Sequence, residues 1–232
     1  MITVRRSGER GSTSIDWLQS RHSFSFGDYI DPANECFGPL RVINEDWIKG
    51  GAGFPPHPHR DMEIVTYILD GAISHRDSSG GGGTIRPGEI QRMSAGTGIT
   101  HAEFNASASE TCHLLQIWIM PSKKGIRPGY EQKTIDAAAV ANHFARIAAP
   151  EPVANEVRLV QDAEIWAARL DAEVEAIHML EPGRKAWLHV ARGEVTVDGE
   201  TLKTGDAAAI TDQDKIAVRS KTASEVLLFD LG

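Results

Sequence analysis

The chain has 232 residues, 41% of them hydrophobic, and its 24 basic against 32 acidic residues give a net charge of -8. This length and composition can supply one large hydrophobic core or two modest ones. The acidic balance argues against a direct nucleic-acid partner, because proteins bind nucleic acids through clustered lysine and arginine. No apolar run approaches the roughly 18 residues of a membrane span, so no membrane partner is expected.

The N-terminal residues and the cysteines bear on the cellular compartment. Residues 1–6 run into charged and polar residues without the apolar segment of a signal peptide. Cys36 and Cys112 are the only cysteines, which argues against a disulfide scaffold and favours a reducing compartment. We therefore expect a cytoplasmic protein.

The hydrophobic pattern is that of short β-strands separated by glycine and proline. The predicted strands include 41–44, 64–69, 72–76, 90–94, 101–105 and 113–120. Many short strands of this kind indicate a β-sandwich or a barrel. An alanine-rich stretch at 136–143 predicts a short helix within a linker, and residues 148–152 form its irregular, proline-containing end.

Two pairs of side chains carry the most information about function. One residue separates His57 from His59, and one residue separates His101 from Glu103. Side chains at i and i+2 of a strand project from the same face, about 6.5 Å apart. Two such pairs on neighbouring strands can direct three imidazoles and a carboxylate to one point, which is a ligand set for a transition metal. Because each imidazole offers a single directional lone pair, other positions on the metal would stay open for exogenous ligands.

Glycines punctuate both pairs. Gly51, the two histidines, Glu63 and Gly71 follow the pattern G-x5-H-x-H-x3-E-x7-G, and residues 96–105 form a second motif. These motifs resemble those of the cupin superfamily, with one extra residue before Gly71 and a glycine at position 96 where proline is usual. Many cupins take their acidic ligand from the first motif, which makes Glu63 the alternative to Glu103.

A longer series of residues resembles the pirin family within this superfamily. The segments that carry the resemblance are WL (17–18), RHSFSF (21–26), YIDP (29–32), FGPLRVINED (37–46), GFPPHPHRDME (53–63) and MSAGTG (93–98). No composition bias would generate so many rare residues in this order. The likeness is close over about the first 130 residues and looser beyond them.

The pirin resemblance implies an all-β protein of two tandem cupin domains, each a double-stranded β-helix or jelly roll. It also implies a metal held by His57, His59, His101 and Glu103, with Glu63 outside the ligand set and iron as the first choice of metal. Mn, Co, Ni, Cu and Zn stay open, because nitrogen and oxygen donors suit all of them. The absence of a cysteine ligand argues against a purely structural zinc site.

A partial internal repeat supports two tandem domains. The matching segments are 67–74 with 188–197, and 87–89 with 204–206. We predict an N-terminal metal-binding domain at 1–133 and a degenerate C-terminal domain at 134–232. Residues 183–187 read GRKAW where the second copy should carry a His-x-His pair, so one metal ion per chain is expected. His178 and His189 are isolated histidines, which usually pack in the core or lie at the surface.

The resemblance leaves two functional hypotheses. Pirins resemble the cupin quercetinases, which implies a dioxygenase that cleaves a flavonol such as quercetin with O2. In such a reaction Glu103 or Glu63 would accept the proton of the substrate hydroxyl as the general base. The alternative is a non-catalytic, metal-dependent redox-sensing or regulatory pirin that acts through a protein partner, for which no motif is visible. The aromatic and apolar residues predicted to line a substrate cavity are Phe54, Met93, Phe104, Ile117 and Trp118.

Overall fold

The structure is a computed structural model that describes residues 1–232. It contains strands β1 to β22 and one short 3-10 helix, η1 (Ser7–Glu9), which confirms the all-β prediction. The chain forms two compact units. The N-terminal unit comprises Gly11–Thr134 and Val157–Gln161, and the C-terminal unit comprises Met1–Arg10, Ile135–Glu156 and Asp162–Gly232. A division at 133/134 differs from these units at the first ten residues, at Thr134 and at 157–161.

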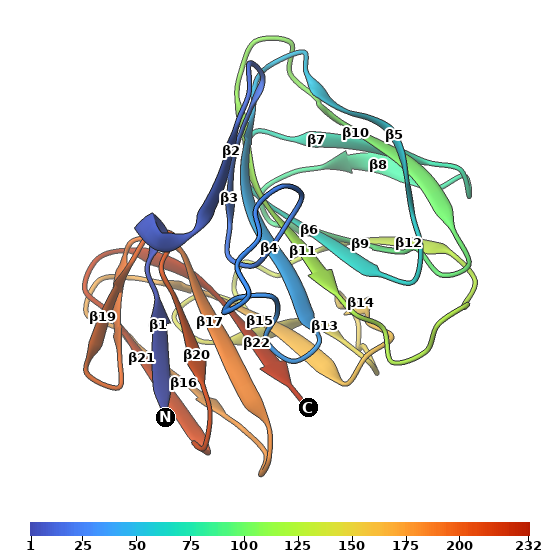
Figure 1. Cartoon of the computed structure of the whole chain (residues 1–232). Helices are drawn as coiled ribbons and strands as arrows, with labels where there is room; N and C mark the ends of the chain where they lie inside the picture. The colour runs from blue at the N-terminus through green and yellow to red at the C-terminus, as the bar shows by residue number, and fades with distance from the viewer. The chain divides into compact units, whose positions relative to one another are not determined.

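The N-terminal unit has two antiparallel sheets (Figure 1). The larger sheet has the order β12-β9-β6-β11-β4-β3-β2 and the smaller has the order β5-β10-β7-β8. The bounds in the larger sheet are β2 (Gly11–Ser14), β3 (Leu18–His22), β4 (Leu40–Ile48), β6 (Glu63–Asp70), β9 (Glu89–Ser94), β11 (Cys112–Ile119) and β12 (Gly129–Thr134). Those in the smaller sheet are β5 (Gly53–His59), β7 (Ile73–Asp77), β8 (Gly82–Ile85) and β10 (Ile99–Asn105). β14 (Val157–Arg158) joins this unit, where the Arg158 backbone N–H donates to Glu131.

The C-terminal unit repeats this design. Its larger sheet runs β1-β20-β17-β22-β15-β13, and its smaller sheet runs β16-β21-β18-β19. The bounds in the larger sheet are β1 (Ile2–Arg5), β13 (Ala145–Ala149), β15 (Ala163–Leu170), β17 (Lys185–Arg192), β20 (Ala207–Ile210) and β22 (Ser224–Leu231). Those in the smaller sheet are β16 (Glu175–Met179), β18 (Glu194–Val197), β19 (Glu200–Lys203) and β21 (Lys215–Ser220). Two jelly-roll domains of the cupin type are thereby confirmed.

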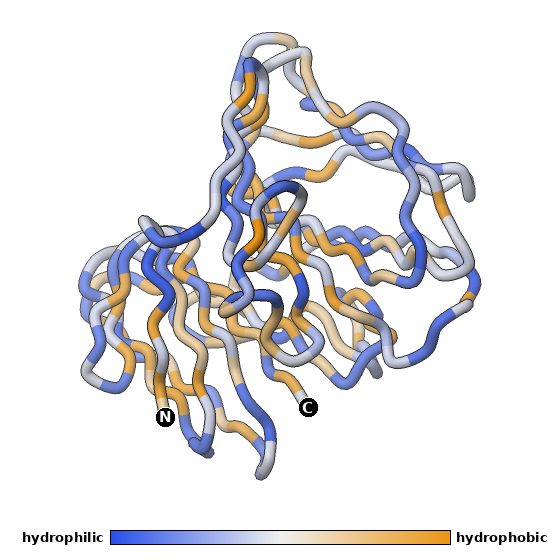
Figure 2. Tube along the Cα trace, viewed as in Figure 1, coloured by the Kyte–Doolittle hydropathy of each residue, from blue (hydrophilic) through white to orange (hydrophobic).

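Hydrophobic side chains between paired sheets stabilise each unit. In the N-terminal unit Ile48 and Ile68 of the larger sheet share one core with Ile73 and Ile85 of the smaller sheet. Strand β10 alternates buried residues with more exposed ones, as expected for a strand with one face toward solvent. Figure 2 shows hydrophobic residues along the strands and hydrophilic residues in many of the turns. The alternation that predicted the strands therefore also forms the core.

The predicted strands all occur, whereas the predicted linker helix does not. Residues 136–143 form successive turns, in which the Ala139 N–H donates to the Asp136 carbonyl at 3.1 Å and Asn142 has a φ of 65°. The Asp136 side chain also accepts a hydrogen bond from the Ala138 N–H at 2.9 Å. A helix this short cannot offset its nucleation cost, and an aspartate that bonds the backbone two residues on favours a turn.

At two positions in the metal motifs, glycine is needed for steric reasons. Gly96 has a φ of 47°, which proline cannot adopt because its ring fixes φ near about −65°. This explains the glycine at the position where proline is usual in cupins. Gly53 lies on β5 against β10, where an added Cβ would stand 2.2 Å from the Glu103 carbonyl oxygen.

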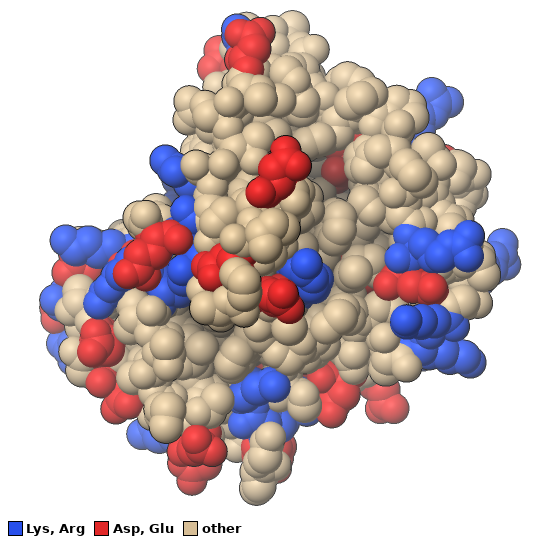
Figure 3. Space-filling model, viewed as in Figure 1, with Lys and Arg blue, Asp and Glu red and all other residues tan.

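The surface does not concentrate positive charge on the face drawn in Figure 3. Lysine and arginine are interspersed there with aspartate and glutamate. No helix in the structure has the length and apolar character that crossing a membrane would require.

Gly53→Ala should destabilise the protein, because the new methyl group would collide with the backbone of the neighbouring strand. We expect a loss of about 1–3 kcal/mol in the free energy of unfolding, the usual cost of overpacking, together with a loss of metal affinity. Gly129→Ala is the matched control, since its Cβ would meet only an Arg92 side-chain nitrogen at 3.6 Å. Urea unfolding of both variants measures the difference, and equal stabilities would contradict the steric argument.

Candidate metal centre

Three histidines meet where β5 pairs with β10. His57 lies directly opposite His101 in this antiparallel pair. The ring centroids of His57 and His101 are 4.4 Å apart, and His59 lies 4.8 Å from each of them. One ligand nitrogen from each ring lies within 4.8 Å of the others. The structure therefore brings together the three imidazoles that the sequence motifs predict.

Hydrogen bonding and burial prepare the three imidazoles to act as metal ligands. The His57 Nδ1–H donates to the Pro55 carbonyl at 2.8 Å, which leaves Nε2 as the lone-pair atom. The His101 Nε2 is buried and has no hydrogen-bond partner. Burial and the neighbouring histidines lower the pKa of His59 to about 4 and that of His101 to about 2. These side chains are thus uncharged at neutral pH, the form that binds metal.

Glu103 lies two residues after His101 on β10, at a register shift in the pairing with β5 where β5 carries the extra residue. It is buried, and the Gln116 amide donates to its Oε1 at 3.2 Å and to its Oε2 at 2.9 Å. Gln116 in turn accepts a hydrogen bond from the Thr66 hydroxyl at 3.0 Å. Burial raises the pKa of Glu103 to about 7, against the opposing effect of the Gln116 hydrogen bond. The chain Thr66–Gln116–Glu103 therefore fixes the carboxyl group in a dry environment.

His75 is a residue of this centre that the sequence motifs did not indicate. It lies on β7 opposite Glu103, and one ligand atom each of His75, His101 and Glu103 lie within 4.8 Å of one another. The His75 Nε2 is 3.1 Å from an Asp77 oxygen, and its Nδ1 is 3.4 Å from the His101 Nδ1. If His75 donates to Asp77, its Nδ1 accepts from His101, whose Nε2 then keeps its lone pair. The i, i+2 spacing of His75 and Asp77 on a predicted strand was the signal that could have found them.

Glu63 lies outside the centre. Its Oε2 accepts hydrogen bonds from the Ser94 hydroxyl at 2.9 Å and from the Val160 backbone N–H at 3.3 Å. Burial raises its pKa, but its side chain does not line the cavity that His57 and His59 border. The catalytic role expected of Glu63 therefore stays a prediction, whereas Glu103 is the carboxylate that lines the cavity.

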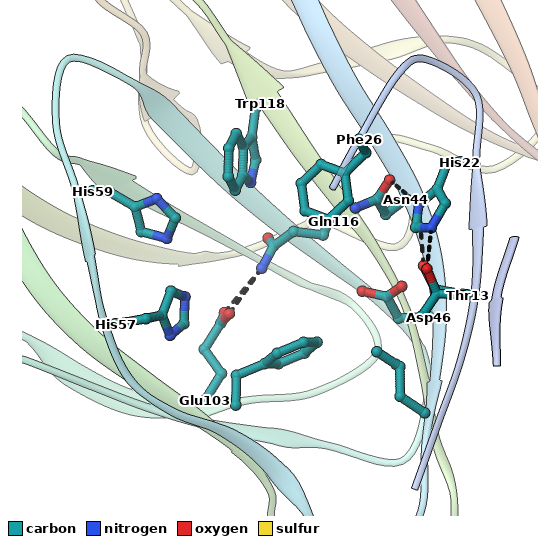
Figure 4. A pocket seen from close by; sticks show the side chains of 13 residues that line it. Thr13, His22, Phe26, Asn44, Asp46, His57, His59, Glu103, Gln116 and Trp118 are labelled. Carbon is teal, nitrogen blue, oxygen red and sulfur yellow. Dashed lines mark hydrogen bonds between the residues drawn. The ribbon is translucent and has the colours of Figure 1, made fainter. Parts of the chain in front are cut away.

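A cavity of about 340 Å³ opens beside the histidines, within the N-terminal unit (Figure 4). Its lining residues are Thr13, Leu18, Ser20, His22, Phe26, Asn44, Asp46, Phe54, His57, His59, Glu103, Gln116 and Trp118. Phe54 and Trp118 were predicted and are present. Met93 and Ile117 instead belong to the core, and Phe104 is 42% exposed. These three expectations were wrong.

One wall of the cavity is polar, and the sequence did not predict it. His22 bridges two neighbours, with its Nδ1 2.8 Å from the Asn44 Oδ1 and its Nε2 2.9 Å from the Thr13 hydroxyl. Asp46 is 4% exposed and its Oδ1 has no hydrogen-bond partner. Burial raises the pKa of Asp46 to about 7, with a further contribution from the negative charge of Glu45.

The isolated histidines of the C-terminal unit lie in different surroundings. His178 on β16 is 2.8 Å from an Asp230 oxygen, and Arg184 makes ion pairs with Asp230 and Asp162. His189 is fully buried on β17. No group of three metal-ligating side chains includes either histidine.

Comparison with known proteins gives consistent matches along the chain. Residues 3–119 match the family model described as Pirin, and residues 146–231 match that described as Quercetinase C-terminal cupin domain. The chain is 43% identical to the quercetin 2,3-dioxygenase of Escherichia coli K12, over 100% of this chain and 99% of that protein. It is similar in structure to YhhW from Escherichia coli, with a TM-score of 0.96 and 43% identity over 100% of this chain and 98% of that one. It is also similar to the nickel(II) complex of the bacterial pirin YhhW, with a TM-score of 0.94 and 42% identity over 100% and 99% of the two chains.

The raised pKa of Asp46 predicts a pH dependence of stability. Between the ordinary value of 3.8 and about 7, the folded protein retains a proton that the unfolded chain has released, so stability falls as pH rises through this window. Each pKa unit corresponds to about 1.4 kcal/mol, which makes the total cost on the order of a few kcal/mol. Without metal, the free energy of unfolding of Asp46→Asn should therefore increase relative to that of the wild type as the pH rises from about 4 to 7. Urea unfolding at several pH values tests this, and a constant difference would refute it.

Proposed function

The chain belongs to the pirin family, and from this premise we propose that it is a metal-dependent dioxygenase that cleaves flavonols such as quercetin with O2. The observation that carries the proposal is the convergence of His57, His59 and His101 at the border of a cavity with aromatic walls. The quercetin 2,3-dioxygenase named among its relatives supports the same chemistry. For the regulatory alternative, no partner motif is visible in the sequence.

We propose His57, His59, His101 and Glu103 as the metal ligands. The unpartnered, buried Nε2 of His101 and the neutral imidazole of His59 beside it fit a divalent ion. When bound, such a metal supplies Lewis acidity and open positions for the reactants. Iron is our first choice, although the donor set suits nickel equally well, and the Escherichia coli pirin was crystallised with nickel(II).

The cavity walls would orient a flat aromatic substrate. Phe54 packs edge-on against Trp17 at 5.1 Å, and Phe26 packs edge-on against Trp118 at 5.4 Å between ring centroids. Trp118 also contacts His59 at 4.9 Å. Aromatic rings held in this way exclude water and offer broad apolar faces to a planar ligand.

Glu103 is the proposed general base. Its carboxyl group lines the cavity and faces the Gln116 amide (Figure 4), which donates to both of its oxygens. A substrate hydroxyl that enters beside the histidines would release its proton to a Glu103 oxygen. The Thr66–Gln116 hydrogen bond keeps that oxygen in place during the transfer.

We also propose a cytoplasmic location. Cys36 and Cys112 are both free thiols, as expected in a reducing compartment.

His59→Ala should remove most of the bound metal, because it deletes one of the three converging imidazoles. We expect a loss of affinity of at least about 10-fold, the lower range seen even for residues that only support metal ligands. His178→Gln is the control, since His178 pairs with Asp230 in the C-terminal unit. Elemental analysis of untagged protein gives the metal per chain. Full occupancy in His59→Ala, or equal losses in both variants, would refute the assignment.

Glu103→Gln should slow quercetin cleavage per bound metal by about 100-fold, the usual scale for loss of a general base. Glu63→Gln is the matched carboxylate control and should retain turnover, because Glu63 does not line the cavity. Rates of dioxygen uptake and of quercetin bleaching are normalised to metal content. Normal turnover in Glu103→Gln would refute the base. A wild type without uptake above free metal would favour the regulatory role instead.

A further inference from the structure

The polar wall of the cavity contains one acceptor that nothing in the protein satisfies. Asp46 lies on β4 with its carboxyl group in the cavity, on the side away from His57 and His59 (Figure 4). Its Oδ1 is buried without a hydrogen-bond partner. Ser20, which is paired with Asp46 across β3 and β4, is the hydrogen-bonding side chain beside it. A buried carboxyl oxygen left unmatched is costly, so its retention calls for a ligand.

The polar side chains near Asp46 already have hydrogen-bond partners within the protein. Both nitrogens of His22 are engaged, one with Asn44 and one with Thr13. The carboxyl group of Glu45, the adjacent residue, accepts from the His113 Nε2 at 3.0 Å. Within this wall the Asp46 carboxyl group thus lines the cavity and keeps one oxygen without a partner in the protein.

The opposite end of the cavity, beside the histidines, contains a hydrogen-bond donor without an acceptor. The Trp118 Nε1–H is buried without an acceptor, and its ring lies against His59. A ligand with acceptor oxygens near the histidines and a hydrogen-bond donor at its far end would satisfy both groups. Between these ends the lining includes Phe26, Phe54 and Leu18, which suits an aromatic framework.

We propose that Asp46 forms a second subsite that accepts a hydrogen bond from a hydroxyl group on the end of the aromatic substrate remote from the three histidines. This inference rests on the proposed function and adds the side chain that would recognise the hydroxyl groups of the substrate remote from the metal. A neutral hydroxyl fits better than an ammonium group, because an ammonium needs three acceptors and this wall offers one. Asp46 is accordingly a specificity-determining residue rather than a base.

The test compares quercetin with 3-hydroxyflavone, which keeps the 3-hydroxyl and 4-carbonyl oxygens but lacks the other hydroxyl groups. Isothermal titration calorimetry of metal-loaded protein without dioxygen measures binding separately from turnover. The wild type should bind quercetin at least about 10-fold more tightly, the equivalent of one charge-assisted hydrogen bond. Asp46→Leu should reduce quercetin affinity to that of 3-hydroxyflavone and leave 3-hydroxyflavone affinity unchanged. Asp46→Asn keeps an acceptor and a similar shape, so its quercetin affinity should lie between those of the wild type and Asp46→Leu. It provides a second variant if leucine prevents folding.

Three outcomes would overturn the subsite. Equal wild-type affinities for the two flavonols, or an unchanged preference in both variants, would mean that Asp46 does not contact the ligand. A loss of affinity for both flavonols alike would mean that Asp46 only supports the cavity wall. If the metal-loaded wild type binds neither flavonol, the proposed function itself fails and the subsite fails with it, whereas the first three results leave flavonol cleavage standing.

Discussion

The pairing of β5 with β10 is the constraint on which the candidate centre depends. It sets His57 opposite His101, and the i, i+2 geometry of β5 then adds His59 on the same face. The close approach of the two strands requires Gly53, because any side chain there would overlap the backbone of β10. Between His101 and Glu103 the pairing shifts register, because β5 advances by three residues where β10 advances by two, and β-bulges of this kind are common beside active sites.

Around this pair of strands the protein stabilises polar groups that would otherwise be costly to bury. Gln116 satisfies Glu103 from the larger sheet, while His75 approaches His101 from the smaller one. Not every group of the centre and its cavity is satisfied: the Asp46 Oδ1, the His101 Nε2 and the Trp118 Nε1 are among the atoms of the protein that are buried without partners. All three residues belong to the metal group or the cavity lining. Sites that give up stability in this way are typical of functional cavities, where a ligand supplies the missing interactions.

The sequence predicted the strands and the three converging histidines because both follow from local periodicity. It failed where contacts depend on register or on which face of a strand is turned inward. If Glu103 faces the cavity, Phe104 must face away, and Ile117 is likewise out of phase with Gln116 and Trp118. The orientation of Glu63 was harder to predict, because β6 is buried on both faces over nearly its whole length. The hydrophobic pattern of such a strand does not show which side chains face the cavity.

His75 and the polar wall were missed for a related reason. His75 reaches the centre only through the pairing of β7 with β10, and no local pattern specifies that register. The wall combines Thr13 with residues of β3 and β4, which the N-terminal pirin motif contains without revealing their common orientation. Family resemblance identified the segment, but three-dimensional structure was needed to assign its side chains to a cavity.

The C-terminal unit indicates how far the fold and the chemistry are separable. It keeps the paired sheets and a core whose residues extend along the chain from Phe144 to Leu228. His178 there is held by Asp230, whose charge Arg184 also balances, so this end of the unit is occupied by an internal ion-pair network. Alternating apolar residues are sufficient to maintain a jelly roll, because they supply the core whether or not its strands carry ligands. The centre in the N-terminal unit is then an addition to a stable framework, which is why its function must be argued from the histidines, Glu103 and the cavity rather than from the fold.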